Sequence, residues 1–178
     1  MNNTIISTTT QQYTSAKTSI NSKRLPAIYN KIRWECFKGG VVLDIGAGKY
    51  TEHIKDFLAQ YNIEYIPYDP YNLSAADNLY ASSNFHRATC VICSNVFNVI
   101  KETKIIYDLH SMITSYGVPY FITVYEGDRS WIGRETKKGC WQRNETMESY
   151  ILNYRETVIN KVITHQDNCI YIKRWRAN

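Results

Sequence analysis

The chain has 178 residues, of which 44% are hydrophobic, a length that fits one domain able to bury a core without disulfides or a metal. Lys and Arg number 21 against 16 Asp and Glu, giving a net charge of +5, which suits an anionic partner but is also compatible with an ordinary solvated surface. The odd number of cysteines, five, in a sequence without a recognisable signal peptide disfavours a disulfide framework and favours a cytoplasmic location. No apolar stretch is long enough to cross a membrane.

The N-terminal segment differs in composition from the rest of the chain. Residues 1–20 are rich in Thr, Ser, Asn and Gln and poor in large apolar side chains, so we expect a flexible arm there. One domain should follow over residues 21–178. Its first element is predicted as a helix over residues 24–37, because the apolar residues there recur at helical spacing.

From residue 41 onward, apolar runs typical of strands alternate with segments of helical periodicity. The predicted strands are 41–45, 65–69, 90–93, 120–125 and 169–172, and the predicted helices lie near 51–58, 102–115 and 146–160. A charged, glycine-containing loop is expected over residues 126–143. This order predicts an α/β fold: a single Rossmann-like sheet, mostly parallel, with helices on both faces.

The strongest local signal is the turn Gly46-Ala47-Gly48, which directly follows the buried strand predicted over 41–45. Glycines there permit a sharp turn and let a ligand approach the N-terminus of the next helix. A dinucleotide-binding loop requires a third glycine or an alanine, where this chain has Thr51. Asp44, two residues before the first glycine, would repel a pyrophosphate and is better suited to an ammonium group.

A second acid, Asp69, ends the next predicted strand, 25 residues after Asp44. This position allows a carboxylate to accept hydrogen bonds from both hydroxyls of a ribose. Two structural alternatives stay open at this point. The glycine turn is a pattern that also occurs by chance, and Asp69 is equally able to cap a helix.

The segments VVLDIGAGKY (41–50), YDP (68–70) and VICSNV (91–96) resemble class I S-adenosylmethionine-dependent methyltransferases, and the similarity covers roughly residues 24–125. The resemblance implies that Gly46 to Gly48 line the methionine part of the cofactor, with Asp44 below its amino group and Asp69 on the ribose. The cofactor-binding residues it implies are Asp44, Ile45, Gly46, Ala47, Gly48, Asp69, Pro70, Tyr71, Ser94 and Asn95.

Within this family, the chain looks most like small, uncharacterised bacteriophage-type members. The runs that carry this likeness are SNVFNVI (94–100), TVYEGDRS (123–130) and GRETKK (133–138). The segment between Asp69 and Cys90 is too short for the usual helix-strand-helix, so we expect the third strand to be trimmed or lost. Asp77 is then the remaining candidate for the acid that contacts adenine. Acceptor motifs of DNA amino- and cytosine-C5-methylating enzymes are absent.

Methyl transfer from a sulfonium depends mainly on alignment, so a dedicated catalytic residue is not required. If a proton must leave, the candidates are Asn95, Glu126 and Asp128, which follow predicted strands. The candidate substrate residues, which combine positive charge with an indole suited to phosphates and bases, are Arg129, Trp131, Arg134, Lys137 and Lys138. The alternative is a solvated loop with its tryptophans packed in the core.

Cys90 and Cys93 form a C-x-x-C within an apolar run. Without a second ligand pair they are better interpreted as strand residues in the core than as metal ligands, and we expect no metal site. The favoured function is a methyltransferase that acts on nucleic acid or a small molecule, with nucleic acid as a candidate acceptor. The alternatives are a non-catalytic or cofactor-sequestering S-adenosylmethionine-binding protein or partner subunit and, less favoured because of Thr51, a nucleotide-dependent oxidoreductase.

Overall fold

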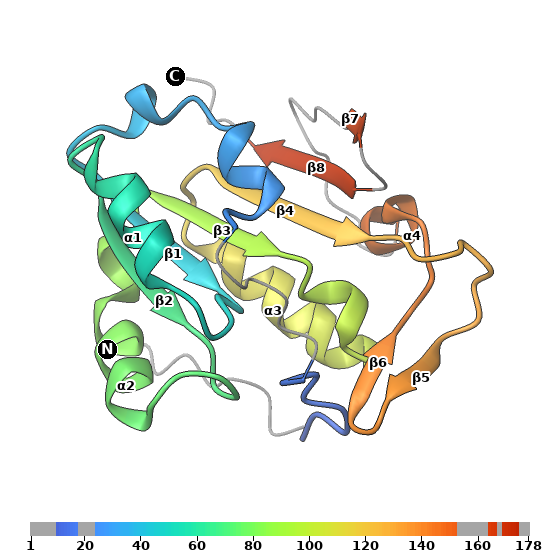
Figure 1. The fold of residues 1–178 in the computed structure, drawn as a ribbon. Helices are drawn as coiled ribbons and strands as arrows, with labels where there is room; N and C mark the ends of the chain where they lie inside the picture. Colours follow the sequence, from blue (N-terminus) through green and yellow to red (C-terminus); the bar gives the residue numbers. More distant parts are fainter. Residues whose placement is uncertain (1–9, 18–23, 153–163, 167–168, 175–178) are drawn as a thin grey trace.

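The computed structural model describes residues 10–17, 24–152, 164–166 and 169–174 (Figure 1). Its centre is a six-stranded sheet of order β2-β1-β3-β4-β8-β7, accompanied by a separate hairpin, β5-β6. The strands are β1 Val41–Ile45, β2 Glu64–Tyr68, β3 Cys90–Ser94, β4 Tyr120–Tyr125, β5 Arg134–Lys137, β6 Cys140–Gln142, β7 Thr164–Gln166 and β8 Cys169–Arg174. The α-helices are α1 Glu52–Ala59, α2 Ala75–Asn84, α3 Thr103–Ser115 and α4 Met147–Leu152.

The sheet is mostly parallel, as predicted. Strands β2, β1, β3 and β4 all run in the same direction, whereas β8 runs antiparallel to β4 and β7 antiparallel to β8. The carboxyl ends of the four parallel strands therefore lie along one edge, here called the carboxyl edge, which is where α/β sheets bind their ligands. The arrowheads of β1, β3 and β4 point toward this edge in Figure 1.

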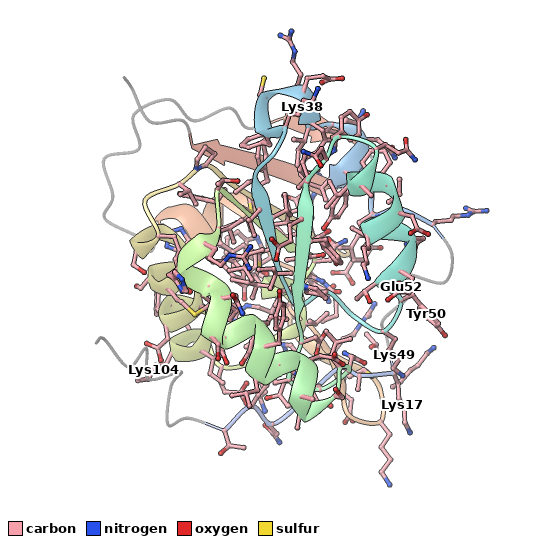
Figure 2. The ribbon with its side chains drawn as sticks, turned by 90° about the vertical axis from the view of Figure 1, so that its left-hand side faces the viewer. Lys17, Lys38, Lys49, Tyr50, Glu52 and Lys104 are labelled. Atoms are coloured by element: carbon pink, nitrogen blue, oxygen red, sulfur yellow. The ribbon has the colours of Figure 1, made fainter. Side chains whose placement is uncertain are left out.

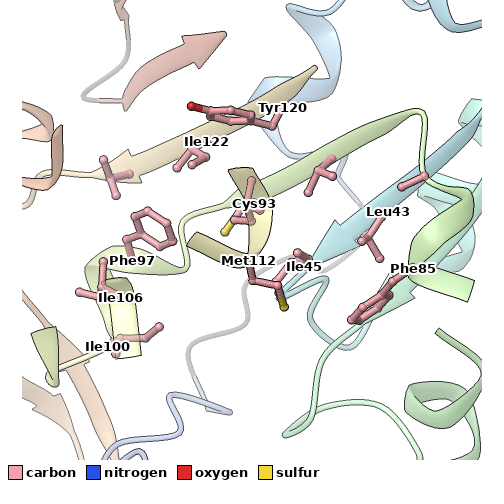
Figure 3. Close-up of a cluster of buried hydrophobic side chains, with 14 of the residues drawn as sticks. Leu43, Ile45, Phe85, Cys93, Phe97, Ile100, Ile106, Met112, Tyr120 and Ile122 are labelled. Carbon is pink, nitrogen blue, oxygen red and sulfur yellow. The ribbon is translucent and has the colours of Figure 1, made fainter. Parts of the chain in front are cut away.

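Apolar side chains from the two faces of the sheet form two separate cores. One core joins Leu43, Ile45, Cys93 and Ile122 to residues of α2, α3 and α4 (Figure 3). The other joins alternate strand residues to α1 and to the two 3₁₀ turns η1 (Ala27–Asn30) and η2 (Trp34–Phe37). The Rossmann-like α/β arrangement, with helices on both faces, is thus confirmed.

The same alternation explains the C-x-x-C. Cys93 belongs to the core under α3, whereas Cys90 belongs to the core under α1, because residues three apart on a strand point to opposite faces. Both thiols are free and buried, and burial raises the pKa of each. The interpretation of these cysteines as core residues is therefore confirmed.

The third strand of a usual α/β unit is lost, as expected. Between Asp69 and Cys90 the chain forms only α2 and the 3₁₀ turn η3 (Phe85–Arg87). Strand β2 consequently lies at the edge of the sheet and pairs with β1 alone. An edge strand tolerates a residue without an N–H group, which accounts for Pro67 in the middle of β2.

Two predicted elements differ from the structure. The helix expected over 24–37 is instead the pair of short turns η1 and η2, with Arg33 between them outside the helical conformation (ψ 87°). The loop expected over 126–143 contains the β5-β6 hairpin. In the C-terminal part, α4 covers the beginning of the helix predicted over 146–160, whose remainder lies outside the described residues, and β7 had no predicted counterpart.

Part of the predicted N-terminal arm makes specific contacts with the body of the protein. The Ser15 N–H donates to the carbonyl of Gly139 at 3.0 Å, and the Trp141 N–H donates to Ser15 Oγ at 3.3 Å. The rings of Tyr13 and Trp141 lie 5.2 Å apart. Residues 10–17 thus pack along β6, while 1–9 and 18–20 lie outside the described residues.

Candidate functional site

The glycine turn lies at the carboxyl edge, immediately after β1. Gly46 and Gly48 have φ values of 76° and 75°, which only glycine adopts without cost. The N–H groups of Gly46 and Ala47 both donate to the carbonyl of Tyr68, at 2.8 and 3.3 Å, and tie the turn to the end of β2. A Cβ on Gly46 would lie 2.3 Å from the Cγ2 of Val96, which follows β3. The position therefore excludes a side chain for two independent reasons.

Asp44 is only 3% exposed and lies below this turn in β1. Two phenol groups donate to the same carboxylate oxygen, Oδ2: Tyr29 Oη at 2.7 Å and Tyr65 Oη at 2.8 Å. Burial raises the pKa of Asp44 to about 6, and the two hydrogen bonds oppose this rise. The site thus contains a carboxylate that is ionised at neutral pH although it is almost completely removed from water.

Asp69 lies on the other side of the same turn. Its Oδ2 accepts from the Gly48 N–H at 3.0 Å and from Asn72 Nδ2 at 3.0 Å. Its Oδ1 accepts from the N–H groups of Tyr71 and Asn72 at 2.9 and 3.1 Å. These four donors use the lone pairs of a carboxylate, so Asp69 closes a local turn. Asn72 Nδ2 is the one side-chain donor among them, and its rotation would free one lone pair of Oδ2, which still accepts from the Gly48 N–H.

Two buried acceptor atoms near this turn have no hydrogen-bond donor among the described residues: Asn72 Oδ1 and Glu102 Oε2. The pKa of Tyr71 is raised, first by burial and then by the charges of Glu102 and Asp69, so both carboxylates act on its phenol. Asp77, by contrast, is exposed and pairs with Ser74 at the start of α2. Glu102 is thus an acid that acts on Tyr71 together with Asp69, and no local signal in the sequence points to it.

Ser94 and Asn95 lie at the carboxyl end of β3, as the sequence indicated. The hydroxyl groups of Ser94 and Thr123 lie 3.0 Å apart. Asn95 is exposed, has a positive φ of 58°, and donates its N–H to the Thr123 carbonyl at 2.8 Å. Because Asn95 directly precedes Val96, which covers Gly46, the ends of β1 and β3 meet here.

The two acidic candidates after β4 are both engaged with neighbours. Glu126 is 1% exposed; its Oε1 accepts from the Met147 N–H at 2.9 Å, and its Oε2 lies 2.6 Å from Arg129 Nη2. Asp128 is exposed and lies 3.5 Å from Arg134 Nη2. Hydrogen bonds from Ser130 lower the pKa of Asp128. Neither group is positioned as an unpaired base in this structure.

The candidate substrate residues lie on the 126–143 segment but differ in their contacts. Arg129 and Arg134 form the ion pairs just described, whereas Lys137 and Lys138 are exposed on β5 and its turn. Trp131 is 60% exposed. Trp141, the other indole of the segment, is half-buried against the arm, so the alternative of a packed tryptophan applies to Trp141 alone.

The outer surface of the glycine turn carries Lys49 and Tyr50. Figure 2 shows both at the opposite end of the molecule from Lys38, which precedes β1, and on the same side as Lys17 of the arm. Tyr50 is 48% exposed. The carboxyl edge thus presents aromatic and basic side chains beside the two buried carboxylates.

No family model and no curated protein matches the chain, so the functional argument depends on the residues and their geometry. Among the described residues, no group of three or more His, Cys, Asp or Glu side chains is suited to hold a metal ion. No helix within the described ranges is long and apolar enough to cross a membrane. The fold and site define an α/β protein with a Rossmann-like sheet and a glycine turn between two buried carboxylates.

Proposed function

We propose that the protein binds S-adenosylmethionine and acts as a methyltransferase of class I type. The observation that carries the proposal is the joint placement of Asp44 and Asp69 on either side of Gly46–Gly48, with the Gly48 N–H bonded to Asp69. A phosphate-binding loop would place backbone N–H groups, without acids, around its ligand. Two carboxylates favour a ligand that carries an ammonium group and neutral hydroxyls.

The oxidoreductase alternative is disfavoured by Thr51, which stands where a dinucleotide-binding loop requires a third glycine or an alanine.

The residues present fit the parts of the cofactor. Asp44 suits the ammonium of the methionine moiety, and Asp69 suits the ribose once Asn72 Nδ2 rotates away from Oδ2. The unsatisfied acceptors Asn72 Oδ1 and Glu102 Oε2 suit an amino group such as that of adenine. When bound, the cofactor supplies an activated methyl group. The chain's own part is to hold the ligand and to exclude water from the buried carboxylates.

Catalysis by alignment is more consistent with the site than catalysis by a strong base. Glu126 is held by the Met147 N–H and by Arg129, and Asp128 is exposed beside Arg134. Asn95 remains as a polar group at the end of β3, next to the residue that covers Gly46. We expect Asn95 to orient the acceptor, which is sufficient for displacement at a sulfonium carbon.

The acceptor we favour is a nucleic acid. Trp131 is exposed, and Lys137 and Lys138 lie on the neighbouring hairpin, a combination that suits base stacking beside phosphate contacts. The engagement of both acids after β4 favours one alternative, a cofactor-binding protein or partner subunit without transfer activity. Incubation with methyl-labelled cofactor and separate DNA, RNA, protein and metabolite fractions distinguishes the two: label in one fraction supports transfer, and label in none supports the alternative.

The cofactor assignment is tested by calorimetric titration with S-adenosylmethionine and S-adenosylhomocysteine. Wild type should bind both, and Gly46→Ala should lose at least about tenfold in affinity, because its Cβ collides with Val96 and shifts the turn. Gly39→Ala is the matched control, since Gly39 has a nearly identical φ of 75° but nothing within 4 Å of an added Cβ. No heat from wild type, or equal affinities for the two variants, contradicts the proposal.

A further inference from the structure

Asp44 receives hydrogen bonds from two tyrosines that come from different parts of the fold. Tyr29 belongs to η1, outside the sheet, and Tyr65 belongs to β2, next to β1. Both hydroxyls donate to Oδ2, at 2.7 and 2.8 Å. The hydrogen bonds of the helices and of the sheet do not require this convergence. It fixes the position of one oxygen of the carboxylate, Oδ2.

The tyrosine from η1 is itself rigidly held. Its ring stacks on Trp34, with centroids 5.5 Å apart, and meets the edge of Phe57 at 6.5 Å. Trp34 Nε1 donates to the Tyr29 carbonyl at 2.7 Å, and both aromatic side chains are almost fully buried. A hydroxyl anchored in this way loses little conformational freedom when it binds a carboxylate, so it is suited to orient Asp44.

The other ionisable groups around Asp44 do not replace these donors. The Asp69 carboxylate opposes ionisation of Asp44. The Cys90 and Cys93 thiols of β3 are neutral, since burial raises the pKa of both. From α1, Glu52 acts on Tyr65 and further disfavours a phenolate there. The phenol groups are therefore the donors that favour the charged form of Asp44.

We infer that Tyr29 and Tyr65 are positioning residues, whose hydroxyls keep Asp44 ionised and oriented to bind the ammonium of an amino-acid-bearing nucleoside. The inference rests on the proposed function and assigns a role to a segment, residues 27–37, that otherwise only covers the sheet. Both tyrosines stay protonated donors over the physiological range, because burial raises the pKa of each well above its ordinary value.

Ligand affinity should therefore depend on pH through Asp44. With its pKa at about 6, wild type should bind S-adenosylhomocysteine about tenfold more weakly at pH 5 than at pH 7.5, because only the ionised carboxylate pairs with the ammonium. Replacing either tyrosine by Phe removes a donor to the charged form and should move the midpoint of this dependence to higher pH. Between the midpoint of wild type and that of a variant, the affinity of the variant for S-adenosylhomocysteine should be lowest relative to wild type. Above the midpoint of the variant, its affinity should approach the wild-type value again.

The experiment is a calorimetric titration between pH 5 and 7.5 with two probes. S-adenosylhomocysteine carries the ammonium, whereas 5′-methylthioadenosine shares the nucleoside but lacks it. The proteins are wild type, Tyr29→Phe, Tyr65→Phe and the control Tyr61→Phe. The control removes a hydroxyl from a ring in the same aromatic cluster that does not bond to Asp44. We expect a shifted midpoint only for the first two variants and only with S-adenosylhomocysteine.

Four results would overturn the inference. A pH-independent affinity of wild type for S-adenosylhomocysteine, or unshifted midpoints in Tyr29→Phe and Tyr65→Phe, leaves cofactor binding intact and removes the role of the tyrosines. A shift of equal size with 5′-methylthioadenosine shows a structural effect instead of an ammonium-specific one. Failure of wild type to bind either probe at any pH contradicts the proposed function itself, and the inference with it.

Discussion

At the scale of residues, the buried carboxylate of Asp44 has a direct consequence for stability. Asp44 is removed from water but ionises with a pKa of about 6, above the ordinary value of 3.8. Folding raises the pKa of this acid, so its protonation stabilises the folded state. Its contribution to the free energy of unfolding is fully present below the pKa of the unfolded state and is lost as the pH rises through the pKa of the folded state. At neutral pH the ionised Asp44 therefore destabilises the free protein, as expected of a group retained for binding.

The variant Asp44→Asn tests this cost. The Asn oxygen still accepts from Tyr29 and Tyr65, but no charge is buried, so the free protein should be more stable at pH 7.5 by up to about 3 kcal/mol. The gain should shrink as the pH falls toward 4.5, where wild-type Asp44 is protonated in the folded state. Urea unfolding at the two pH values measures it; a gain that is equal at both values contradicts the assignment. Affinity for S-adenosylhomocysteine should fall in the same variant.

The residues that could be predicted from the sequence are those defined by local signals. Asp44 and Asp69 end apolar runs, and Gly46 and Gly48 mark the turn between a strand and a helix, so their shared edge followed from the α/β pattern. Tyr29, Tyr65 and Glu102 carry no such signal. They reach the site through packing of η1, the face of β2 and the loop before α3, contacts that join residues distant in the sequence.

At the scale of elements, residues 10–17 of the N-terminal arm and the β5-β6 hairpin form one unit with the loop before α3. Ser15 bonds to both Gly139 and Trp141, and the Lys101 ammonium lies 5.4 and 5.2 Å from the ring centres of Tyr13 and Trp141. Polar composition predicted a flexible arm, but composition does not reveal a partner surface. The helix predicted over 24–37 failed for a related reason: its apolar spacing reflects two aromatic anchors that pack separately on the sheet.

Trp141 should therefore hold residues 10–17 in place. Trp141→Ala removes the ring that packs on Tyr13 and one side of the cation–π contact, so chymotrypsin cleavage after Tyr13 should become several-fold faster. Trp131→Ala is the matched control, since that indole is 60% exposed and belongs to the same segment. Limited proteolysis with mass spectrometry measures the rates, and equal rates for the two variants exclude a role of Trp141 in anchoring the arm.

At the scale of the whole molecule, loss of one strand simplifies the sheet without moving the candidate site. The turn after β1, the end of β2 and the end of β3 remain adjacent because the register of β1 with both neighbours is continuous. The edge position of β2 is compatible with Pro67, and Glu102 is the acid we propose for the adenine as a substitute for the exposed Asp77. The sequence predicted the lost strand from length alone, whereas the substitute required the folded chain.

A net charge of +5 attracts any anionic polymer to the whole molecule, so the proposed nucleic acid acceptor has to be assigned to a defined surface. We test the β5-β6 hairpin as that surface with the double variant Lys137→Glu with Lys138→Glu. It should bind a single-stranded oligonucleotide at least about tenfold more weakly. The slope of the logarithm of the association constant against the logarithm of the salt concentration should fall by about 1.4, the value for two lost phosphate contacts. Lys38→Glu with Lys55→Glu makes the same change in net charge on exposed residues elsewhere and should have a much smaller effect. Fluorescence anisotropy over a salt series measures both quantities. Equal losses of oligonucleotide affinity in the two double variants point to net charge alone. An unchanged salt slope in the hairpin variant excludes this acceptor surface. As a control, the affinity for S-adenosylhomocysteine should stay at the wild-type value in both double variants.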